Sequence, residues 1–335
     1  MNGCTMNSSV ETRSGRGCTW ISWAYHRRSD FLAREFGCVY HYTGGGSGSR
    51  SIRYLRGLLG TVKILGGERP AVLFVQNPSL LLAIFAILLK PFYRYYLVND
   101  LHTPYIELPK PLDTLFWGLQ KMCVRFSDLT LVTNEGFRKR FEHGNVMILP
   151  DIMPDFGETG RRELEGESNV LYVCTFAGDE PYGNVIEAAT KLDGGTHIYI
   201  TGNYTRAGLD VELVPPNVHL TGFVTDEDYI ELMNSSDAVM VLTGQENCLV
   251  CGGYEGASFM KPLILSDTSA LRDYFNRGAV YIDHDIESIA SGIELALRGR
   301  EKLEAELLRL RGELDDDWRR KFSAIQERIG GRCRD

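Results

Sequence analysis

The sequence predicts an α/β protein of two doubly wound, Rossmann-like domains that face each other across a cleft. Short apolar runs rich in Val, Ile, Leu and Tyr alternate with amphipathic segments along almost the whole chain, the pattern of parallel sheets covered on both faces by helices. A polar stretch without apolar periodicity, residues 154–168, divides this series into two halves. The 335 residues are enough for two domains of ordinary size. In open sheets of this kind the ligand site lies at the carboxyl ends of the strands.

The first domain is expected at residues 18–153. It follows a polar, Gly/Ser-rich tail (1–17) that lacks the apolar core of a secretory signal and is expected to be disordered. The most apolar stretch, residues 80–89, is too short to cross a bilayer, which needs roughly 20 residues. We therefore expect a fully buried helix that ends before Pro91. The alternating pattern predicts strands at 18–25, 38–42, 71–76, 94–100, 128–133 and 146–151, and helices at 27–37, 51–65, 78–90, 112–126 and 135–141.

Residues 154–168 are expected to be a linker and residues 169–312 a second domain. The final segment, 313–335, is expected to be a helix, because apolar residues recur at positions 318, 322, 325 and 329. Within the second domain the pattern predicts strands at 169–176, 197–203, 217–223, 238–244, 261–267 and 279–283, and helices at 183–192, 226–236, 252–260 and 269–278.

Charge is unevenly distributed between the two halves. Residues 1–150 carry 18 Lys and Arg against 10 Asp and Glu, whereas residues 151–335 carry 18 against 34. A basic half joined to an acidic half suggests an anionic partner on the basic side, either a membrane surface or an acidic substrate. The simpler alternative is that both are ordinary solvated surfaces of different charge.

The eight cysteines are scattered, and several lie inside apolar runs, so we expect reduced, buried thiols and not a disulfide framework. Cys248 and Cys251 form a Cys-x-x-Cys motif within residues 246–267, ENCLVCGGYEGASFMKPLILSD. A thioredoxin-like dithiol would follow an early strand, and a zinc site would need a second close pair of ligands. Neither context is present in the sequence, although both interpretations stay open at this point.

A third interpretation of the same stretch is a phosphate-binding helix start. A strand ends shortly before it, and the backbone amides that begin a helix are unpaired and favour an anion. Gly252 and Gly253 would let a phosphate approach, and Glu255 could accept hydrogen bonds from a ribose diol; alternatively, Glu255 only complements the helix dipole. The chain has neither a dinucleotide fingerprint nor a P-loop motif, which argues against a dehydrogenase or a P-loop enzyme.

This block resembles glycosyltransferase family 4, a family of retaining enzymes with the GT-B fold. The family has a Glu, seven residues and a second Glu, followed by a helix, a turn containing proline and a strand that ends in Ser-Asp. Here Glu255 matches the second glutamate, Pro262 the proline, and Ser266 and Asp267 the strand end. "NVHLTGFV", which ends in Phe223 and Val224, resembles the block before the motif, and "YLVNDLHTPY" resembles the strand that carries Asp-x-His.

The resemblance covers nearly the whole chain after residue 18, with two departures. The position of the first family glutamate is Asn247, with Glu246 beside it, so one of these two is expected to meet the sugar. The family's Arg and Lys that hold the diphosphate are replaced by the acidic "FAGDEP" at 176–181. The diphosphate is therefore expected to meet the helix start and the basic pair Arg27 and Arg28 of the first domain.

The resemblance implies transfer of a sugar, with retention, from a nucleotide-diphosphate sugar to a glycan or lipid-linked acceptor, without a metal or other cofactor. It also implies a last helix that crosses back to the first domain. We expect a cytoplasmic protein, with attachment to the cytoplasmic face of a membrane through the basic first domain as an alternative; no nucleic acid is expected. A sugar-nucleotide epimerase and a non-catalytic binding protein of the same architecture are the rival hypotheses. The implied catalytic residues are His102, Glu246 and Asn247, and the implied donor-binding residues are Cys251, Gly252, Gly253, Glu255, Phe223, Val224, Arg27 and Arg28.

Overall fold

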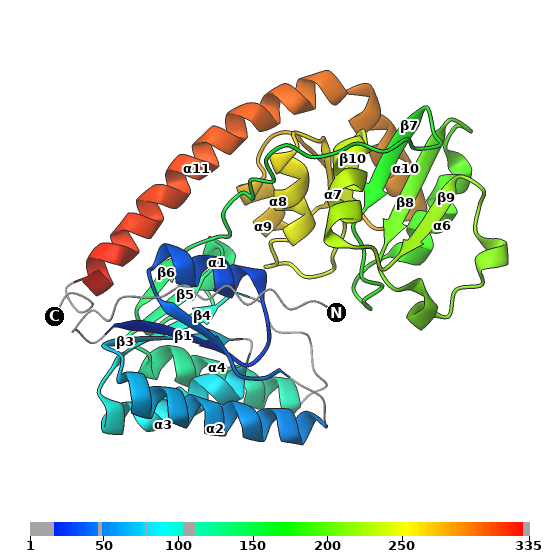
Figure 1. The fold of residues 1–335 in the computed structure, drawn as a ribbon. Coiled ribbons are helices and arrows are strands. Elements are labelled where there is room, and N and C mark those ends of the chain that lie inside the picture. Colours follow the sequence, from blue (N-terminus) through cyan, green and yellow to red (C-terminus); the bar gives the residue numbers. More distant parts are fainter. Residues whose placement is uncertain (1–16, 46–48, 78, 103–110, 331–335) are drawn as a thin grey trace.

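The computed structural model describes residues 17–45, 49–77, 79–102 and 111–330 (Figure 1). Within these residues the chain forms two six-stranded sheets in which every strand pair is parallel. The two sheets belong to separate halves of the chain, and helices cover both faces of each. The predicted pair of doubly wound domains is thus confirmed. Nearly all of the predicted tail, 1–16, lies outside the described residues.

The first domain has strand order β2-β1-β3-β4-β5-β6. Alternate residues of each buried strand face opposite sides of the sheet: Phe74 packs with Leu32 and Trp20 on one face, whereas Leu73 packs with Leu65 and Leu82 on the other. The elements are β1 (Cys18–Ser22), α1 (Arg27–Glu35), β2 (Val39–Tyr42), α2 (Arg50–Glu68), β3 (Val72–Asn77), α3 (Leu80–Tyr93), β4 (Tyr96–Leu101), α4 (Leu112–Phe126), β5 (Leu129–Val132), α5 (Glu135–Arg138) and β6 (Val146–Ile148).

The second domain has strand order β12-β11-β10-β7-β8-β9. One core lies under α6 and α10, and the other lies under α7, α8 and α9. The elements are β7 (Ser168–Tyr172), α6 (Tyr182–Ala188), β8 (Thr196–Thr201), β9 (Val218–Gly222), α7 (Asp226–Ser235), β10 (Ala238–Val241), α8 (Cys251–Ser258), β11 (Leu263–Ser266), α9 (Ser269–Tyr274), β12 (Ala279–Ile282) and α10 (Ile286–Arg298), with short 3-10 turns at Ala189–Lys191, Tyr204–Ala207 and Val211–Leu213.

One long helix, α11 (Arg300–Gly330), joins the cores of both domains. Its first half places Leu307 and Leu310 in the second domain, and its second half places Trp318, Phe322, Ile325 and Ile329 in the first. The Trp318 indole N–H donates to the Pro150 carbonyl at 3.1 Å, which anchors the helix beside the exit of the first domain. The expected return of the last helix to the first domain is confirmed, and the segment 313–330 is part of the same helix that begins at Arg300 (Figure 1).

The most apolar helix differs from its sequence prediction in two ways. It was expected to be fully buried, but Leu81, Leu88 and Phe92 on α3 are 53%, 63% and 80% exposed, because only one side of the helix packs against the sheet. Pro91 was expected to lie beyond the helix, but it lies within the last turn. A proline removes a single amide there, and the helix still ends on a bond from the Arg94 N–H to the Lys90 carbonyl at 2.8 Å.

The expectation that all cysteines are reduced was also wrong. Cys18 and Cys38 form a disulfide with a Cα–Cα distance of 4.5 Å. The two residues stand side by side because β1 pairs with β2 in a register that sets Thr19 opposite Val39. This neighbour relation is a property of the sheet, and the spacing of the two cysteines in the sequence does not reveal it.

Candidate active site

The segments that follow the strands of one sheet contact those that follow the strands of the other. Arg27, after β1, reaches Asp226 and Glu255 of the second domain. The Asn134 side-chain amide, after β5, donates to the Asn247 carbonyl at 2.9 Å. The carboxyl ends of both sets of strands therefore meet at the domain interface, where the sequence predicted the ligand site.

His102 comes directly after β4 and is buried. Its Nδ1 lies 2.8 Å from an Asp100 carboxylate oxygen, and its ring lies 4.4 Å from the ring of His26, between centroids. Because an ionised carboxylate only accepts, this contact leaves the proton of a neutral His102 on Nδ1 and a lone pair on Nε2. The Nε2 atom is buried and has no hydrogen-bond partner among the residues that the structure describes.

Arg28 is the centre of a buried ionic network. Its guanidinium, 2% exposed, donates to Asp100 at 3.0 Å, to Asp151 at 2.6 Å and to the Leu149 carbonyl at 2.8 Å. Burial would raise the pKa of Asp100, but the charge of Arg28 and the hydrogen bonds from Arg28 and His102 outweigh it and hold that pKa below its ordinary value. The structure thus places Arg28, predicted to bind the diphosphate, with its donors turned inward to protein acceptors.

Arg27 and Glu255 face each other across the domain interface. The Arg27 side chain is 59% exposed, with a nitrogen 2.6 Å from Asp226 and another 3.7 Å from Glu255. Glu255 is largely buried and accepts a hydrogen bond from the Tyr229 hydroxyl at 2.5 Å. Burial raises the pKa of Glu255, and the Tyr229 hydrogen bond and the Arg27 charge offset part of this rise.

Helix α8 begins close to these residues, and its N-cap residue, Val250, makes no side-chain cap; the Gly253 N–H donates to the Val250 carbonyl at 3.0 Å. Its glycines are buried against the sheet: a Cβ on Gly252 would lie 3.0 Å from Val173 and Val241, and one on Gly253 would lie 3.1 Å from Phe275. Packing alone therefore requires small residues at these two positions. The close approach of Gly252 to Val173 and Val241 also places the first backbone amides of α8, which begins at Cys251, at the ends of β7 and β10.

Glu246 and Asn247, the two candidates for a sugar contact, have different surroundings. A Glu246 oxygen accepts from the Ser269 backbone N–H at 2.8 Å and so caps α9, while its side chain stays exposed. Asn247 lies against the first domain: besides the bond from Asn134, its side-chain oxygen is so near Gly136 that a Cβ there would approach to 2.5 Å. Among the described residues, only Asn247 of the pair contacts the first domain.

Phe223 and Val224 follow β9 and lead into α7. Phe223 is 92% exposed, which is unusual for a large aromatic side chain, whereas Val224 is partly buried and packs in the second core beside Tyr229. Phe223 thus offers a free aromatic face on the same domain that carries Glu255.

The acidic loop 176–181 is folded on itself. One Glu180 carboxylate oxygen accepts from the backbone N–H groups of Thr175 at 2.9 Å and Ala177 at 2.8 Å. Asp179 accepts from the Thr243 hydroxyl at 2.7 Å. The Glu180 carboxylate therefore occupies the backbone amides that follow β7, and Asp179 ties the loop to the segment after β10.

The Cys-x-x-Cys motif carries neither a disulfide nor a cluster of metal ligands in the described part of the chain. Cys248 and Cys251 are both free. Burial raises the pKa of the Cys248 thiol to about 11, so it is protonated at neutral pH and a poor nucleophile. The described residues group three metal-ligating side chains only elsewhere, at Glu165, His197 and His219.

Several residues of this site have no assigned role in the sequence prediction: His26, Asp100, Asp151 and Tyr229. Asp100 had a signal, because it lies two residues before His102 at the end of a strand, where alternate side chains share a face. His26, Asp151 and Tyr229 lie in a loop, a connection and a helix, and only the assembled fold brings them together.

Comparison with known proteins supports the fold. No family model and no curated protein sequence matches the chain. Among solved structures, sucrose-phosphate synthase from Thermosynechococcus elongatus is 12% identical, with a TM-score of 0.67, over 92% of this chain and 100% of that one. Anabaena HepE in complex with UDP is 11% identical, with a TM-score of 0.67, over 94% and 100%.

A third similar structure is an α,α-trehalose-phosphate synthase (UDP-forming) from Burkholderia xenovorans in complex with glucose-6-phosphate. It is 14% identical, with a TM-score of 0.63, over 84% of this chain and 79% of that one. At these identities the similarity establishes the fold alone. This chain has the GT-B fold. The narrower resemblance to glycosyltransferase family 4 stays a prediction.

We expect His26 to make the stability of the protein depend on pH. Its side chain accepts from the Arg28 backbone N–H and so caps α1. Burial lowers the pKa of His26 to about 4, although Asp151 and Asp100 act in the opposite direction. Because the unfolded chain binds this proton from about pH 6.5, the free energy of unfolding should fall by about 1–3 kcal/mol as pH falls from about 6.5 to about 4.

The measurement is urea unfolding at a series of pH values. His26→Asn keeps a capping side chain that does not titrate, so its stability should fall less steeply over this range. The exposed His143→Asn serves as the control and should follow the original protein. Equal slopes for all three proteins would contradict the prediction.

Proposed function

We propose that this protein is a glycosyltransferase that uses a nucleotide-diphosphate sugar as its donor. The observation that carries the proposal is Glu255 at the start of α8, bonded to Tyr229 and facing Arg27 across the domain interface of a GT-B fold. Two of the structurally similar proteins are a UDP complex and a UDP-forming enzyme, which supports a nucleotide as the ligand of this interface.

The donor is proposed to bind mainly to the second domain. The Glu255 carboxylate accepts hydrogen bonds from the two ribose hydroxyls, and the exposed ring of Phe223, supported by Val224, stacks on the base. The diphosphate lies at the start of α8, where the N-cap residue has no capping side chain and the backbone amides and helix dipole favour an anion. Arg27 supplies a positive side chain close to this helix start.

The proposed reaction is a transfer with retention that needs no metal. The bond between the anomeric carbon and the diphosphate oxygen breaks, its electron pair stays on that oxygen, and the acceptor oxygen forms the new bond. The acceptor proton passes to the departing diphosphate. Helix α8 and Arg27 stabilise the charge that develops on the leaving group. His102 Nε2 accepts a hydrogen bond from a sugar hydroxyl, as does Asn247 or Glu246.

A non-catalytic nucleotide-sugar binding protein is the second candidate, and one observation favours it. The Glu180 carboxylate accepts hydrogen bonds from backbone N–H groups that follow β7. In glycosyltransferase family 4, basic residues at this place hold the diphosphate. A sugar-nucleotide epimerase of the same architecture is a third candidate, and the assay below includes it.

The test is incubation with labelled UDP- and GDP-sugars, with and without glycan and lipid-linked acceptors, and with and without EDTA. We expect acceptor-dependent transfer that EDTA does not abolish, with the anomeric configuration retained in the product. Epimerised sugar without transfer would identify an epimerase, and binding without turnover a binding protein. Activity lost in EDTA and restored by Mg²⁺ or Mn²⁺ would overturn the metal-independent mechanism.

Nucleotide affinity should depend on Glu255. In Glu255→Ala the ribose hydroxyls lose their acceptor, and we expect UDP or GDP to bind more weakly by about 1–3 kcal/mol, or about 5- to 150-fold, in calorimetric titration. Glu227→Ala removes an exposed glutamate from the first turn of the neighbouring α7 and serves as the control. Equal affinities for Glu255→Ala and the control would reject the ribose assignment.

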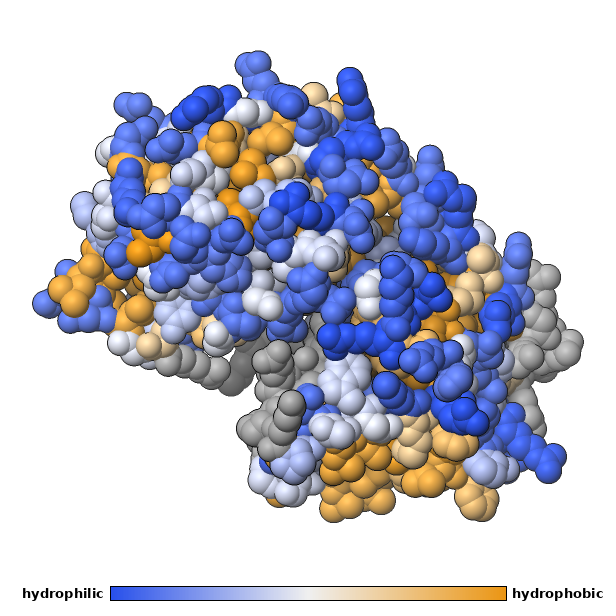
Figure 2. Space-filling model, turned by 180° about the vertical axis from the view of Figure 1, so that it is seen from behind, coloured by the Kyte–Doolittle hydropathy of each residue, from blue (hydrophilic) through white to orange (hydrophobic). Residues whose placement is uncertain are grey.

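We further propose that the first domain attaches to an anionic membrane and takes a lipid-linked acceptor there. None of the described helices combines the length and apolar composition that a membrane crossing needs, so the attachment would be peripheral. Exposed apolar side chains gather on the outer face of the first domain, at the bottom of Figure 2. They come from the adjacent helices α2, α3 and α4: Ile52, Leu55, Leu59, Val62, Leu81, Leu88, Phe92, Leu112 and Leu115.

The charge of these three helices suits an anionic surface. They carry seven Lys and Arg against two Asp and Glu. Basic side chains near anionic lipid contribute about 1 kcal/mol each and are screened by salt. An apolar face surrounded by basic residues is the composition of interfacial helices.

Vesicle flotation tests this attachment. We expect the protein to float with vesicles that contain anionic lipid, less so as salt is added, and Leu55→Glu/Leu59→Glu to stay in the soluble fraction. Leu213→Glu, which changes an 80% exposed leucine of the second domain, is the control and should float. Equal recovery of the original protein with neutral and anionic vesicles at low salt would refute the membrane proposal.

A further inference from the structure

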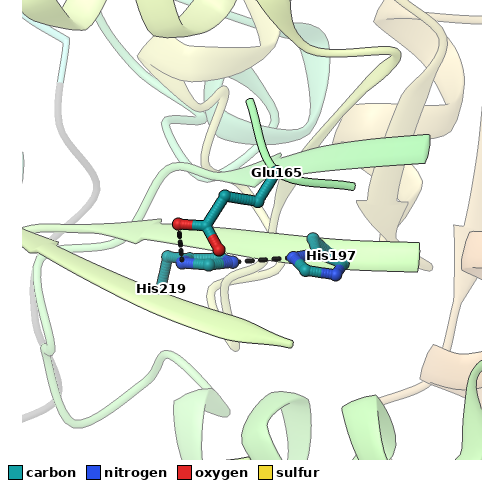
Figure 3. A group of neighbouring side chains, drawn as sticks. All are labelled: Glu165, His197 and His219. Carbon is teal, nitrogen blue, oxygen red and sulfur yellow. Dashed lines mark hydrogen bonds and ion pairs between the residues drawn. The ribbon is translucent and has the colours of Figure 1, made fainter. Parts of the chain in front are cut away.

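Three metal-ligating side chains, Glu165, His197 and His219, meet in the second domain (Figure 3). His197 Nδ1 lies 2.8 Å from His219 Nε2, and a Glu165 oxygen lies 3.7 Å from His219 Nδ1. One ligand atom from each residue lies within 4.8 Å of the others. Both histidines are partly buried, and the Glu165 side chain is 73% exposed.

The fold brings the two histidines together by strand register. Tyr199 of β8 is opposite His219 of β9, and His197 shares the face of Tyr199 because it lies two residues earlier on the strand. The His219 ring stacks on both, with centroids 4.4 Å from Tyr199 and 5.0 Å from His197. The register and the stacking fix both imidazoles on one face of the sheet.

The linker supplies the carboxylate, and two further contacts hold it in place. The Glu165 backbone N–H donates to the Tyr199 hydroxyl at 2.8 Å. The next residue, Gly166, passes so close to the sheet that a Cβ would lie 2.9 Å from the His197 Cβ and 2.7 Å from the Ser168 carbonyl oxygen. A glycine at this position therefore lets the linker bring Glu165 over the histidine pair.

We propose that Glu165, His197 and His219 bind a divalent cation of the zinc class, which fastens the linker to the second sheet. Two imidazoles and a carboxylate are a common donor set for such ions. Ligand bonds of about 2.0–2.1 Å in a tetrahedral site separate two nitrogens by about 3.3 Å, so a small opening of the present 2.8 Å contact admits the ion. The exposed Glu165 carboxylate turns to complete three ligands, and water takes the fourth position.

The site is separate from sugar transfer. His197 and His219 are the second residues of β8 and β9, at the amino ends of parallel strands. The candidate active site lies at the carboxyl ends of the strands. The ion would thus bind the linker without contact with the donor, and the inference stands whether or not the proposed function is correct.

Zinc titration of the metal-free full chain by calorimetry tests the site. We expect one Zn²⁺ per chain and a rise in melting temperature with Zn²⁺. His197→Gln/His219→Gln should abolish both effects, whereas the control His41→Gln/His143→Gln, in the first domain, should keep them. Zn²⁺ binding of equal affinity in both double variants would overturn the proposal.

Two further measurements keep the test decisive if the first double variant does not fold. Glu165→Gln leaves the backbone bond to Tyr199 in place and should weaken Zn²⁺ binding about tenfold or more, since even outer-shell changes cost about 10- to 100-fold. Unchanged affinity in this variant would also reject the site. The Co²⁺ spectrum should lack a thiolate charge-transfer band; its presence would assign the ion to cysteine instead.

Discussion

The buried guanidinium of Arg28 is the constraint on which the carboxyl-end edge of the first sheet depends. A cation removed from water must be paired and hydrogen-bonded, and loss of one partner of a buried pair typically costs about 3–5 kcal/mol. The partners of Arg28 are Asp100 at the end of β4 and Asp151 with the Leu149 carbonyl after β6. The chain is therefore held at the point where it leaves the first domain. Trp318 of α11 bonds to Pro150 in the same segment.

The same network also orients the candidate catalytic histidine. Asp100 divides its carboxylate: one oxygen accepts mainly from Arg28, and the other faces His102 Nδ1. The positive charge of Arg28 keeps Asp100 ionised, and the ionised carboxylate keeps the His102 proton on Nδ1. The lone pair of Nε2 is thus available to a ligand. Arg28 acts on this site through Asp100, which differs from the direct phosphate contact that the sequence suggested.

Sequence patterns predicted the elements well because each pattern reflects local burial. Strands buried on both faces, the periodic helices and the apolar stripe that ends α11 all follow from which residues avoid water. The prediction did not separate Arg27 from Arg28, because adjacent helical residues differ by about 100° in direction and only the fold shows which one turns inward. The Cys18–Cys38 disulfide and the exposed side of α3 depend in the same way on which elements lie side by side.

The candidate site was predictable to the extent that its residues follow strands. Glu255 was predicted from a strand, two glycines and a helix start, and the family resemblance supplied Asn247 and His102; ligand sites of parallel sheets lie at the carboxyl ends of strands. The sequence could not show that Glu246 caps α9 or that Tyr229 reaches Glu255, since the two contacts join residues 23 and 26 positions apart in the sequence. Glu165 was assigned only to a linker for the same reason: its histidine neighbours lie on later strands.

In the proposed donor site, one side chain, Arg27, both joins the two domains and binds the diphosphate. The backbone N–H groups at the loop 176–181 already donate to the Glu180 carboxylate. The second domain therefore offers little positive charge of its own to a diphosphate. Arg27, an exposed cation close to Glu255, belongs to the first domain and pairs with Asp226. A bound diphosphate would compete with Asp226 for Arg27. Donor binding and closure of the domain interface would then share one side chain, so that neither domain alone forms the complete site.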